Sequence, residues 1–534
     1  MKLRRGSLGA GLLMKLRRVL PDRNEPRWLL LGLVIALLAT IWFGRNHHEA
    51  LMGDDLILLQ QSRQPGGSAH SFFDSFVDVT SDKWRPLLTP AQSILTRAFD
   101  GSYQAWVHLL TVLEWLNVMA ATALAWLLSG RRWLVASIFA VALITSRFNN
   151  YFVWQTFGLM EGLALSATIA CIAAARLAWR TGSRRWLAAT IVASAAAGLV
   201  HERYLCLVVF VALLALLMPA QMRLLERLGW VGGALLVPLS NYVVKVHVLH
   251  VDFFAGAAGV DVHPTLSSVL GFLGDGVASL AGYNLGPSHL TGADARTLGL
   301  LPKLLTAIFV ACVLAIVIAA IVRDVRRGAR WLVPWLLGPA LLVPLLVVAS
   351  ISVRQEHRWL YTPQIVLLLG VAWAAGRAHG LTWTAGRAAR ALPTTAVLAT
   401  ALLASAAVDL IYARHVDDVY FMTGQRMADS VLDRVVDQHR TELATTTVFL
   451  MSVDPVFRDF YLAGGWFFRY YGAGTNPDVR FVAPGANIAR AKDVRPNRLV
   501  FRVERDQVVE VPVAVPTPGA GVAGATPRRR RAGG

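Results

Sequence analysis

Long apolar runs recur along most of this 534-residue chain, and they constrain its fold more than any other feature. A helix needs about 20 apolar residues to cross the hydrocarbon core of a bilayer. Hydrophobic residues make up 55% of the sequence and charged residues only 16%, against about 25% charged residues in a soluble domain. Transmembrane β-strands would instead be short segments that alternate apolar and polar residues. The chain is therefore predicted to be an all-α polytopic membrane protein.

Basic turns between the apolar runs predict how the chain crosses the membrane. Lys and Arg concentrate in cytoplasmic loops of membrane proteins. In this sequence a basic turn follows every second apolar run, at Arg131-Arg132, Arg176–Arg185, Arg223 with Arg227, Arg323–Arg330 and Arg377–Arg390. The alternation predicts about eleven transmembrane helices, with the N-terminus in the cytoplasm and the C-terminus outside. The expected spans are roughly 28–44, 104–128, 133–148, 157–178, 186–201, 203–220, 228–246, 302–322, 331–352, 359–376 and 393–412. The expected location is the bacterial plasma membrane.

Composition divides the chain into successive segments. Met-Lys-Leu-Arg-Arg occurs at Met1 and again at Met14, which fits either an internal start codon or a chance repeat. Two large loops, 45–103 and 247–300, are expected on the outer side of the membrane. The predicted segments are a basic cytoplasmic N-terminus (1–27), a transmembrane domain (28–412), an extracytoplasmic α/β domain (413–511) and a disordered tail rich in Pro, Gly, Ala and Arg (512–534).

Smaller elements are predicted inside these segments from their periodicity. Residues 71–79, 86–99 and 267–280 carry apolar residues on one helical face, which is typical of helices that lie flat at a membrane interface. In the C-terminal domain we expect helical segments over 417–439 and 454–471, and strands over 445–453 and 499–511.

The net charge of +19 raises the question of nucleic-acid binding. Its placement in short loops between apolar runs is explained by membrane orientation, and the Arg528–Arg531 run is too short to indicate a nucleic-acid partner. The three cysteines lie in or beside apolar runs and form neither a disulfide framework nor a metal-binding spacing. Membrane lipid, and no nucleic acid, is the expected partner from charge alone.

Three polar clusters are predicted to face the outer side of the membrane. The first is Asp54-Asp55 with Lys83 and Arg85, the second is His201-Glu202-Arg203, and the third contains Arg358 and Tyr361. Carboxylates can deprotonate an acceptor hydroxyl, and arginines can bind a phosphate leaving group with two parallel hydrogen bonds. The alternatives are that the Asp pair caps an interfacial helix and that the arginines anchor helix ends at the interface.

Structural roles are the favoured interpretation of two further polar groups, Glu114 and the pair His250 and Asp252. Glu114 lies in the middle of the second apolar run, where an ionisable group is either functional or bonded to a neighbouring helix. We favour a bond between Glu114 and a neighbouring helix. His250 and Asp252 have a spacing that could hold a metal, although loop histidines are more often simply solvated.

The order of these motifs resembles the GT-C membrane glycosyltransferases, most closely the protein O-mannosyltransferase-like and tetratricopeptide-bearing branch. The resemblance rests on the acidic pair, on Trp84-Arg85-Pro86-Leu87, on Tyr103-x-x-Trp106-Val107-His108, on Leu199-Val200-His201-Glu202 and on Arg358-Trp359-Leu360-Tyr361-Thr362-Pro363. It implies sugar transfer at the outer face from a polyprenyl-phosphate-linked donor to a glycan, lipid or protein. It also implies Asp54 as the catalytic base, with Asp55 beside it. Arg358 and Tyr361, one helical turn apart, are then expected to contact the lipid phosphate at the membrane surface, with Arg85 as the second candidate. The chain departs from that branch by having His201 in place of Lys and by lacking tetratricopeptide repeats.

Other functions remain open at this point. A transporter of lipid-linked glycans would carry broken helices and polar groups near the middle of the membrane. A non-catalytic scaffold would use residues 413–511 to bind partners and would not need Asp54. The sugar, the acceptor, the stereochemistry, the oligomeric state and any divalent cation cofactor are not determined by the sequence.

Overall fold

The structure is a computed structural model that describes residues 25–44, 48–63, 84–154, 156–219, 221–250, 253, 265–283, 299–328, 331–350, 358–378, 394–412, 420–452, 454–472, 475–488, 491–504 and 506–512. The chain forms two compact units. A helical unit contains Met1–Leu51 and Asp55–Thr423, and a C-terminal unit contains Met52–Asp54 and Gly424–Gly534.

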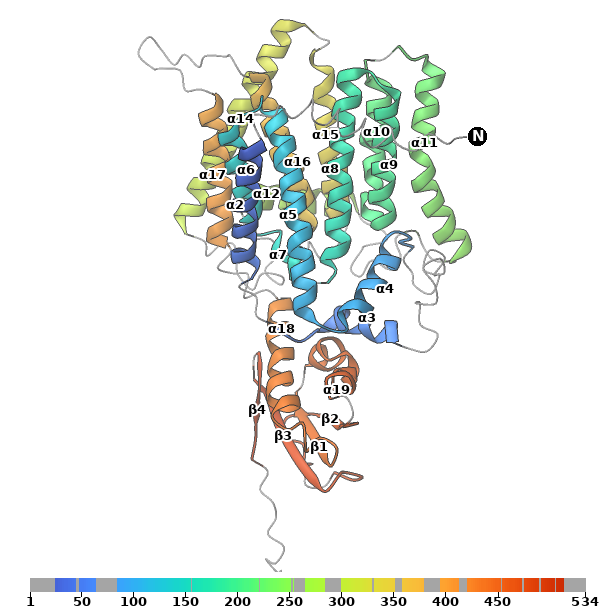
Figure 1. Cartoon of the computed structure of the whole chain (residues 1–534), viewed down its shortest axis with the longest axis vertical. Coiled ribbons are helices and arrows are strands. Elements are labelled where there is room, and N and C mark those ends of the chain that lie inside the picture. The colour runs from blue at the N-terminus through green and yellow to red at the C-terminus, as the bar shows by residue number, and fades with distance from the viewer. Residues whose placement is uncertain are drawn as a thin grey trace, which may run out of the picture. The chain divides into compact units, whose positions relative to one another are not determined.

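Seven helices in the described part of the helical unit are long and apolar enough to cross a membrane, by length and composition. They run side by side in the helical unit (Figure 1). They are α2 (Glu25–Phe43), α5 (Tyr103–Leu128), α8 (Gly158–Thr181), α11 (Leu224–Val243, continued by the π-helical turn η4, Val244–Val248), α14 (Leu300–Arg327), α16 (Arg358–Ala378) and α17 (Thr394–Tyr412). The prediction of a helical membrane protein is confirmed at this level.

The predicted count of eleven spans does not fit the structure. The runs 133–148, 186–201, 203–220 and 331–352 form α-helices of 17 residues or fewer, below the typical spanning length of about 20 residues. They are α6 (Trp133–Ile144), α9 (Arg184–Val200), α10 (Leu207–Leu217) and α15 (Leu337–Ser350). Two of the runs begin with 3₁₀ turns, η3 (Glu202–Cys206) before α10 and η7 (Val333–Leu336) before α15, which take residues from the α-helix.

The end of α6 shows why an apolar run overestimates a helix. Its α-helix stops at Ile144, and the side-chain amide of Asn149 donates to the carbonyls of Leu143 (2.7 Å) and Ile144 (2.8 Å). Polar side chains that bond to nearby backbone groups compete with helix continuation. The buried segment that follows leads into the short helix α7 (Asn150–Val153). Non-helical backbone at membrane depth is tolerated where protein surrounds it, as it does here.

Small residues bring α5 and α8 together. A Cβ placed on Gly162 of α8 would lie 2.6 Å from a methyl carbon of Leu113 on α5. At this crossing Asn117 donates to the Gly162 carbonyl (3.0 Å), and Ser166 donates to the Asn117 side chain (2.6 Å). Close backbone approach at small residues and interhelical hydrogen bonds are the usual stabilisers of helix pairs in lipid.

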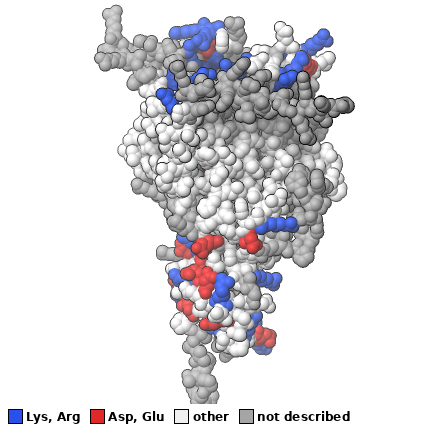
Figure 2. Space-filling view, in the orientation of Figure 1, with Lys and Arg blue, Asp and Glu red and all other residues white. Residues whose placement is uncertain are grey.

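Basic side chains gather at one end of the helical unit. Arg131 and Arg132 follow α5, Arg180 lies in the last turn of α8, and Arg377 lies in the last turn of α16. Figure 2 shows Lys and Arg at the upper end of the helical unit and a broad belt of uncharged residues below it. This distribution is the one expected when basic turns remain on the cytoplasmic side.

Shorter helices complete the described part of the helical unit. The first loop contributes α3 (Gly53–Arg63), which belongs to the helical unit from Asp55 onwards, and α4 (Leu88–Phe99), which falls within the amphipathic segment 86–99. The segment 267–280 forms α12 (Leu266–Ala281), which packs against α14, α15 and α16. The helix expected over 71–79 lies outside the described residues.

The C-terminal unit carries a four-stranded sheet, which confirms the predicted strands. The strand order is β2 (Asp478–Val482), β1 (Thr446–Met451), β3 (Asn497–Glu504) and β4 (Gln507–Glu510), with β1 parallel to β2 and β3. The segment 499–511 forms most of the antiparallel β3–β4 hairpin. Helical elements are α18 (Tyr420–Val431), η9 (Leu432–Asp437), η10 (Phe457–Tyr461), η11 (Ala463–Gly465) and α19 (Trp466–Tyr471).

Candidate functional site

The two carboxylates of the acidic pair have different surroundings. Asp54 is exposed, whereas Asp55 is buried in the helical unit. Asp55 accepts hydrogen bonds from the backbone N–H (3.3 Å) and the hydroxyl of Thr156. Successive side chains on a helix point about 100° apart, so α3 cannot give both carboxylates the same environment. Asp55 is therefore placed to orient the start of α3, and Asp54 is the exposed carboxylate.

Arg85 joins the first loop to the turn after α9. Its Nε and Nη2 donate to the two carboxylate oxygens of Glu202, at 2.7 and 2.8 Å. The backbone supports this contact, because the carbonyl of Arg85 accepts from the N–H groups of Leu88 and Thr89 at the start of α4 (both 3.0 Å). The two-pronged geometry is the strong form of an Arg–carboxylate pair. Arg85 is thus bound to protein, which weakens its predicted role as a phosphate ligand.

His201 and Glu202 lie in the turn between α9 and η3, outside the membrane-spanning helices. Burial, with Arg85 nearby, lowers the pKa of His201 to about 4, although Glu202 opposes this shift. Burial opposes ionisation of Glu202, but Arg85 and His201 outweigh it and hold the pKa of Glu202 well below its usual range. At neutral pH the turn therefore holds a neutral imidazole and an ionised carboxylate. Nδ1 of His201 accepts from the backbone N–H of Arg203 (3.3 Å).

A buried carboxylate that sequence reasoning missed, Glu161, connects this turn to the bundle. It lies in the first turn of α8, accepts from Nη2 of Arg203, and accepts from the hydroxyl of Tyr204 (3.2 Å). The imidazole Nε2 of His201 lies 3.8 Å from its Oε1. A single Glu inside an apolar run is a signal for a functional or paired group, and it could have been found at Glu161 as it was at Glu114.

The same cluster reaches the first turns of α16. The Tyr204 hydroxyl lies 2.7 Å from the Thr362 hydroxyl, and the Arg203 guanidinium carbon lies 4.8 Å from the centre of the Trp359 ring. Nε and Nη1 of Arg203 are buried and have no hydrogen-bond partner within the described chain. The structure therefore brings together residues from all three predicted clusters. We call Arg85, Glu161, His201, Glu202, Arg203, Tyr204, Trp359 and Thr362 the polar cluster.

Tyr361 does not occupy the position predicted for it. Its side chain is fully buried, and its hydroxyl donates to Oε1 of Glu114 on α5. The predicted contact of Tyr361 with a lipid phosphate at the membrane surface does not fit this placement, because packing turns this face of α16 towards α5. The structural interpretation of Glu114 agrees with this bond. Lys83 and the side chain of Arg358 lie outside the described residues, so their predicted roles stay predictions.

A second buried cluster, also missed by sequence reasoning, surrounds Arg147 after α6. Nε of Arg147 lies 3.6 Å from Oδ1 of Asp409 on α17, and its guanidinium lies 4.5 Å from the Tyr412 ring centre. Gln364 of α16 donates to Asp409 (3.0 Å) and accepts from Ser146 (2.6 Å). The ion pair with Asp409 offsets the buried charge of Arg147, although Nε and Nη1 of Arg147 have no hydrogen-bond partner within the described chain.

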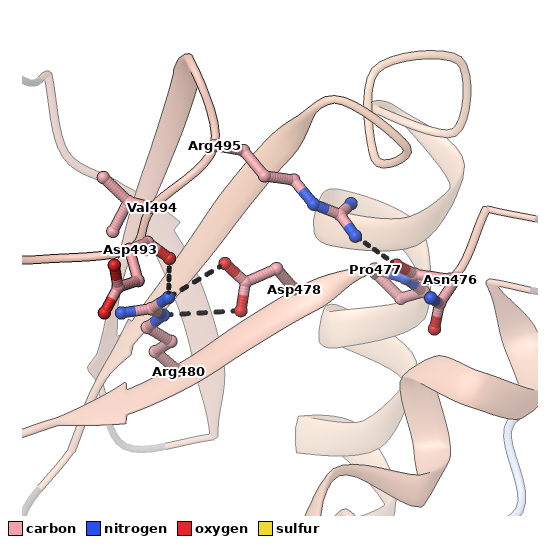
Figure 3. Close-up of a pocket in the computed structure, with 7 residues that line it drawn as sticks. All are labelled: Asn476, Pro477, Asp478, Arg480, Asp493, Val494 and Arg495. Carbon is pink, nitrogen blue, oxygen red and sulfur yellow. Dashed lines mark hydrogen bonds and ion pairs between the residues drawn. The ribbon is translucent and has the colours of Figure 1, made fainter.

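The C-terminal unit has a polar depression at the starting ends of its parallel strands (Figure 3). Its arginines are engaged within the protein. Arg480 pairs with Asp478 (3.3 Å) and donates to the Lys492 carbonyl (2.8 Å), while Arg495 donates to the carbonyls of Leu443 and Asn476. Ligands of open α/β sheets bind at the carboxyl ends of parallel strands instead. These contacts hold loops to the sheet.

The described side chains do not form a metal site. Among the described residues no group of three or more His, Cys, Asp or Glu side chains is arranged to hold a metal ion. Asp55 already accepts two hydrogen bonds from Thr156. His250 has a left-handed backbone (φ 54°), and Asp252 lies outside the described residues. The described carboxylates therefore do not fit the divalent cation considered from the sequence.

The titration of His201 predicts an acid-sensitive fold. A histidine with a depressed pKa binds fewer protons when folded, so stability is lost as pH falls from the ordinary value of 6.5 towards about 4. We expect the free energy of unfolding to fall in this window by up to about 1.4 kcal/mol per pH unit. Thermal unfolding of the detergent-solubilised protein at several pH values measures this. His201→Asn keeps an acceptor for Arg203 without titrating, so it should flatten the profile, and an unchanged profile would contradict the assignment.

Comparisons with known proteins supply no relative. No protein-family model, no curated protein and no solved structure matches the chain. The polar cluster therefore has to be interpreted from its own geometry.

Proposed function

We propose that the protein is an integral membrane glycosyltransferase that moves a sugar from a polyprenyl-phosphate-linked donor to a glycan, lipid or protein acceptor. The observation that carries the proposal is the convergence of three distant sequence clusters into the polar cluster. Side-chain contacts within the helical unit join Arg85 to Glu202, Arg203 to Glu161 and Trp359, and Tyr204 to Thr362. The resemblance of the same motifs to GT-C enzymes supports the same function.

The reaction assigned to these residues is a displacement at the anomeric carbon of the donor. Asp54 takes the proton from an acceptor hydroxyl, the acceptor oxygen forms a bond to the anomeric carbon, and the bond from that carbon to the phosphate oxygen breaks. The polyprenyl phosphate leaves with the electron pair. Asp55, bound to Thr156, orients the helix that carries the base. A positioned base contributes about 10²- to 10⁴-fold in rate.

Arg203 is the described group best suited to the leaving phosphate. Its Nη2 is bound to Glu161, its guanidinium lies over Trp359, and its Nε and Nη1 donors remain unpartnered in the described chain. A fixed guanidinium with open donors stabilises charge that develops in the transition state. Nε and Nη2 of Arg85 both donate to Glu202, so Arg203 replaces Arg85 as the second candidate beside Arg358.

The orientation in the membrane is part of the proposal. The basic end of the helical unit is assigned to the cytoplasm, and the polar cluster and the C-terminal unit are assigned to the outer face of the bacterial plasma membrane. The support is the position of the basic turns.

A reporter fused after Val511 tests this orientation. We expect an enzyme reporter that functions outside the cytoplasm to be active in intact cells and one that functions in the cytoplasm to be inactive. A matched fusion after Arg131, in the basic turn after α5, should give the opposite pattern. Cytoplasmic activity of the Val511 fusion would place the C-terminal unit inside and would overturn the proposed outer-face reaction.

One observation favours a transporter as a second candidate. Arg147, Asp409 and Gln364 form a buried polar cluster beside the interrupted helix α6, and transporters place such groups inside the bundle. A transporter would move a lipid-linked glycan across vesicles without changing it. Purified protein in proteoliposomes, given polyprenyl-phosphate sugars and candidate acceptors, distinguishes the two functions by mass spectrometry. Product formation supports transfer, whereas unchanged glycan on the opposite leaflet supports transport.

A further inference from the structure

Gly53, directly before the acidic pair, is held against an aromatic ring of the C-terminal unit. Met52–Asp54 belong to this unit although the chain on both sides of them belongs to the helical unit. Gly53 has φ of +57°, a left-handed conformation, and is buried. A Cβ built on it would lie 2.9 Å from Cζ and 3.0 Å from Cε1 of Phe460. Both the backbone conformation and the ring therefore require glycine at this position.

Phe460 is supported by the unit that carries it. It lies in η10, whose first residue, Phe457, is almost fully buried. The rings of Phe460 and Tyr461 lie 5.9 Å apart, and a Cβ on Gly424 would lie 2.6 Å from the Tyr461 ring. A close approach to glycine thus fixes Tyr461 as well. The ring that covers Gly53 is held on a packed segment and not on an unsupported side chain.

We propose that Phe460 is a positioning residue, which seats on Gly53 and thereby sets the direction of the Asp54 carboxylate. This inference rests on the proposed function. Glycine has the widest choice of backbone conformations, so a ring packed on it removes the conformers that would turn Asp54 away. A misplacement of about 1 Å can cost about 10²-fold in rate even when the change is remote from the reacting atoms. Through Phe460, the C-terminal unit would then contribute to the rate of sugar transfer.

Removing the ring tests the proposal. Phe460→Ala should lower kcat for sugar transfer by about 10²-fold and leave KM for the donor nearly unchanged, because geometry and not binding is lost. Phe460→Tyr keeps the ring and should restore most of the rate. Trp466→Ala removes another half-buried aromatic ring of the same unit, one that stacks on Tyr470 in α19, and is the matched control. Normal turnover in Phe460→Ala, or an equal loss in Trp466→Ala, would overturn the proposal.

A double-mutant cycle tests the contact itself. Gly53→Ala alone should impair turnover through its left-handed backbone and through the clash with Phe460. Adding Phe460→Ala removes the clash, so the loss in the double variant should be smaller than the product of the two single losses. Independent, multiplicative losses would contradict the contact.

An activity-independent measurement separates this proposal from the proposed function. Met52 is buried, and a Met52→Cys variant without the three native cysteines reports on opening of this segment. Phe460→Ala should raise the rate at which a maleimide labels Cys at position 52, and Trp466→Ala should not. Faster labelling in Phe460→Ala, together with no transfer product from the unmodified protein, would reject the glycosyltransferase and keep the contact. Unchanged labelling together with an inactive Asp54→Asn would reject the positioning role and keep the enzyme.

Discussion

Replacing Asp54 with asparagine is expected to lower the rate of sugar transfer by about 10²- to 10⁴-fold while the protein stays folded. Asparagine has the same shape but cannot accept the proton of the acceptor hydroxyl. Asp54 is exposed, so its replacement should leave the thermal unfolding temperature nearly unchanged. The measurement is single-turnover transfer by purified protein in proteoliposomes, with the unfolding temperature recorded for each variant.

Asp55→Asn is the matched control for this prediction. Asp55 is buried and accepts two hydrogen bonds from Thr156. Asparagine can accept these bonds with its carbonyl oxygen, so the loss of turnover should be milder and accompanied by some loss of stability. Near-full turnover in Asp54→Asn would reject Asp54 as the base. A reversed order, with Asp55→Asn the less active variant, would transfer that role to Asp55.

The helices of this fold could be predicted wherever apolar runs and α-helices coincide. The long helices α5, α8, α14 and α17 each match a predicted span within a few residues. The prediction failed where polar side chains or turns interrupt an apolar run, as Asn149 does after α6. Hydropathy records transfer into lipid and does not record where the backbone hydrogen bonds of a helix end.

The sequence predicted where the residues of the candidate site lie better than it predicted which side chains they contact. The basic-turn pattern predicted that Arg85 and the His201–Arg203 turn share one face, and the Arg85–Glu202 pair brings them together. Tertiary packing decides which residues of a helix point towards its neighbours, and the sequence does not record this. Tyr361 therefore bonds to Glu114 and not to a surface ligand. The strand β2 was also missed, because its charged, half-buried residues carry little apolar alternation.

Glu161 and Arg203 are expected to affect stability more than any other pair in the polar cluster. Both side chains are buried, and Arg203 donates to Glu161 from the turn after α9. Removing one partner of a buried pair leaves an uncompensated charge, at a cost of about 3–5 kcal/mol. Glu161→Leu and Arg203→Met should therefore each lower the free energy of unfolding by this amount, measured by denaturant unfolding in detergent.

The double variant separates stability from chemistry. Replacing a buried ion pair with apolar residues of similar volume is often neutral or stabilising, so Glu161→Leu with Arg203→Met should recover most of the stability that either single change loses. Sugar transfer should not recover, because the guanidinium with unpartnered donors is gone and nothing stabilises the leaving phosphate. If the double variant regains both stability and turnover, Arg203 supports the fold alone, and the phosphate role passes to Arg358.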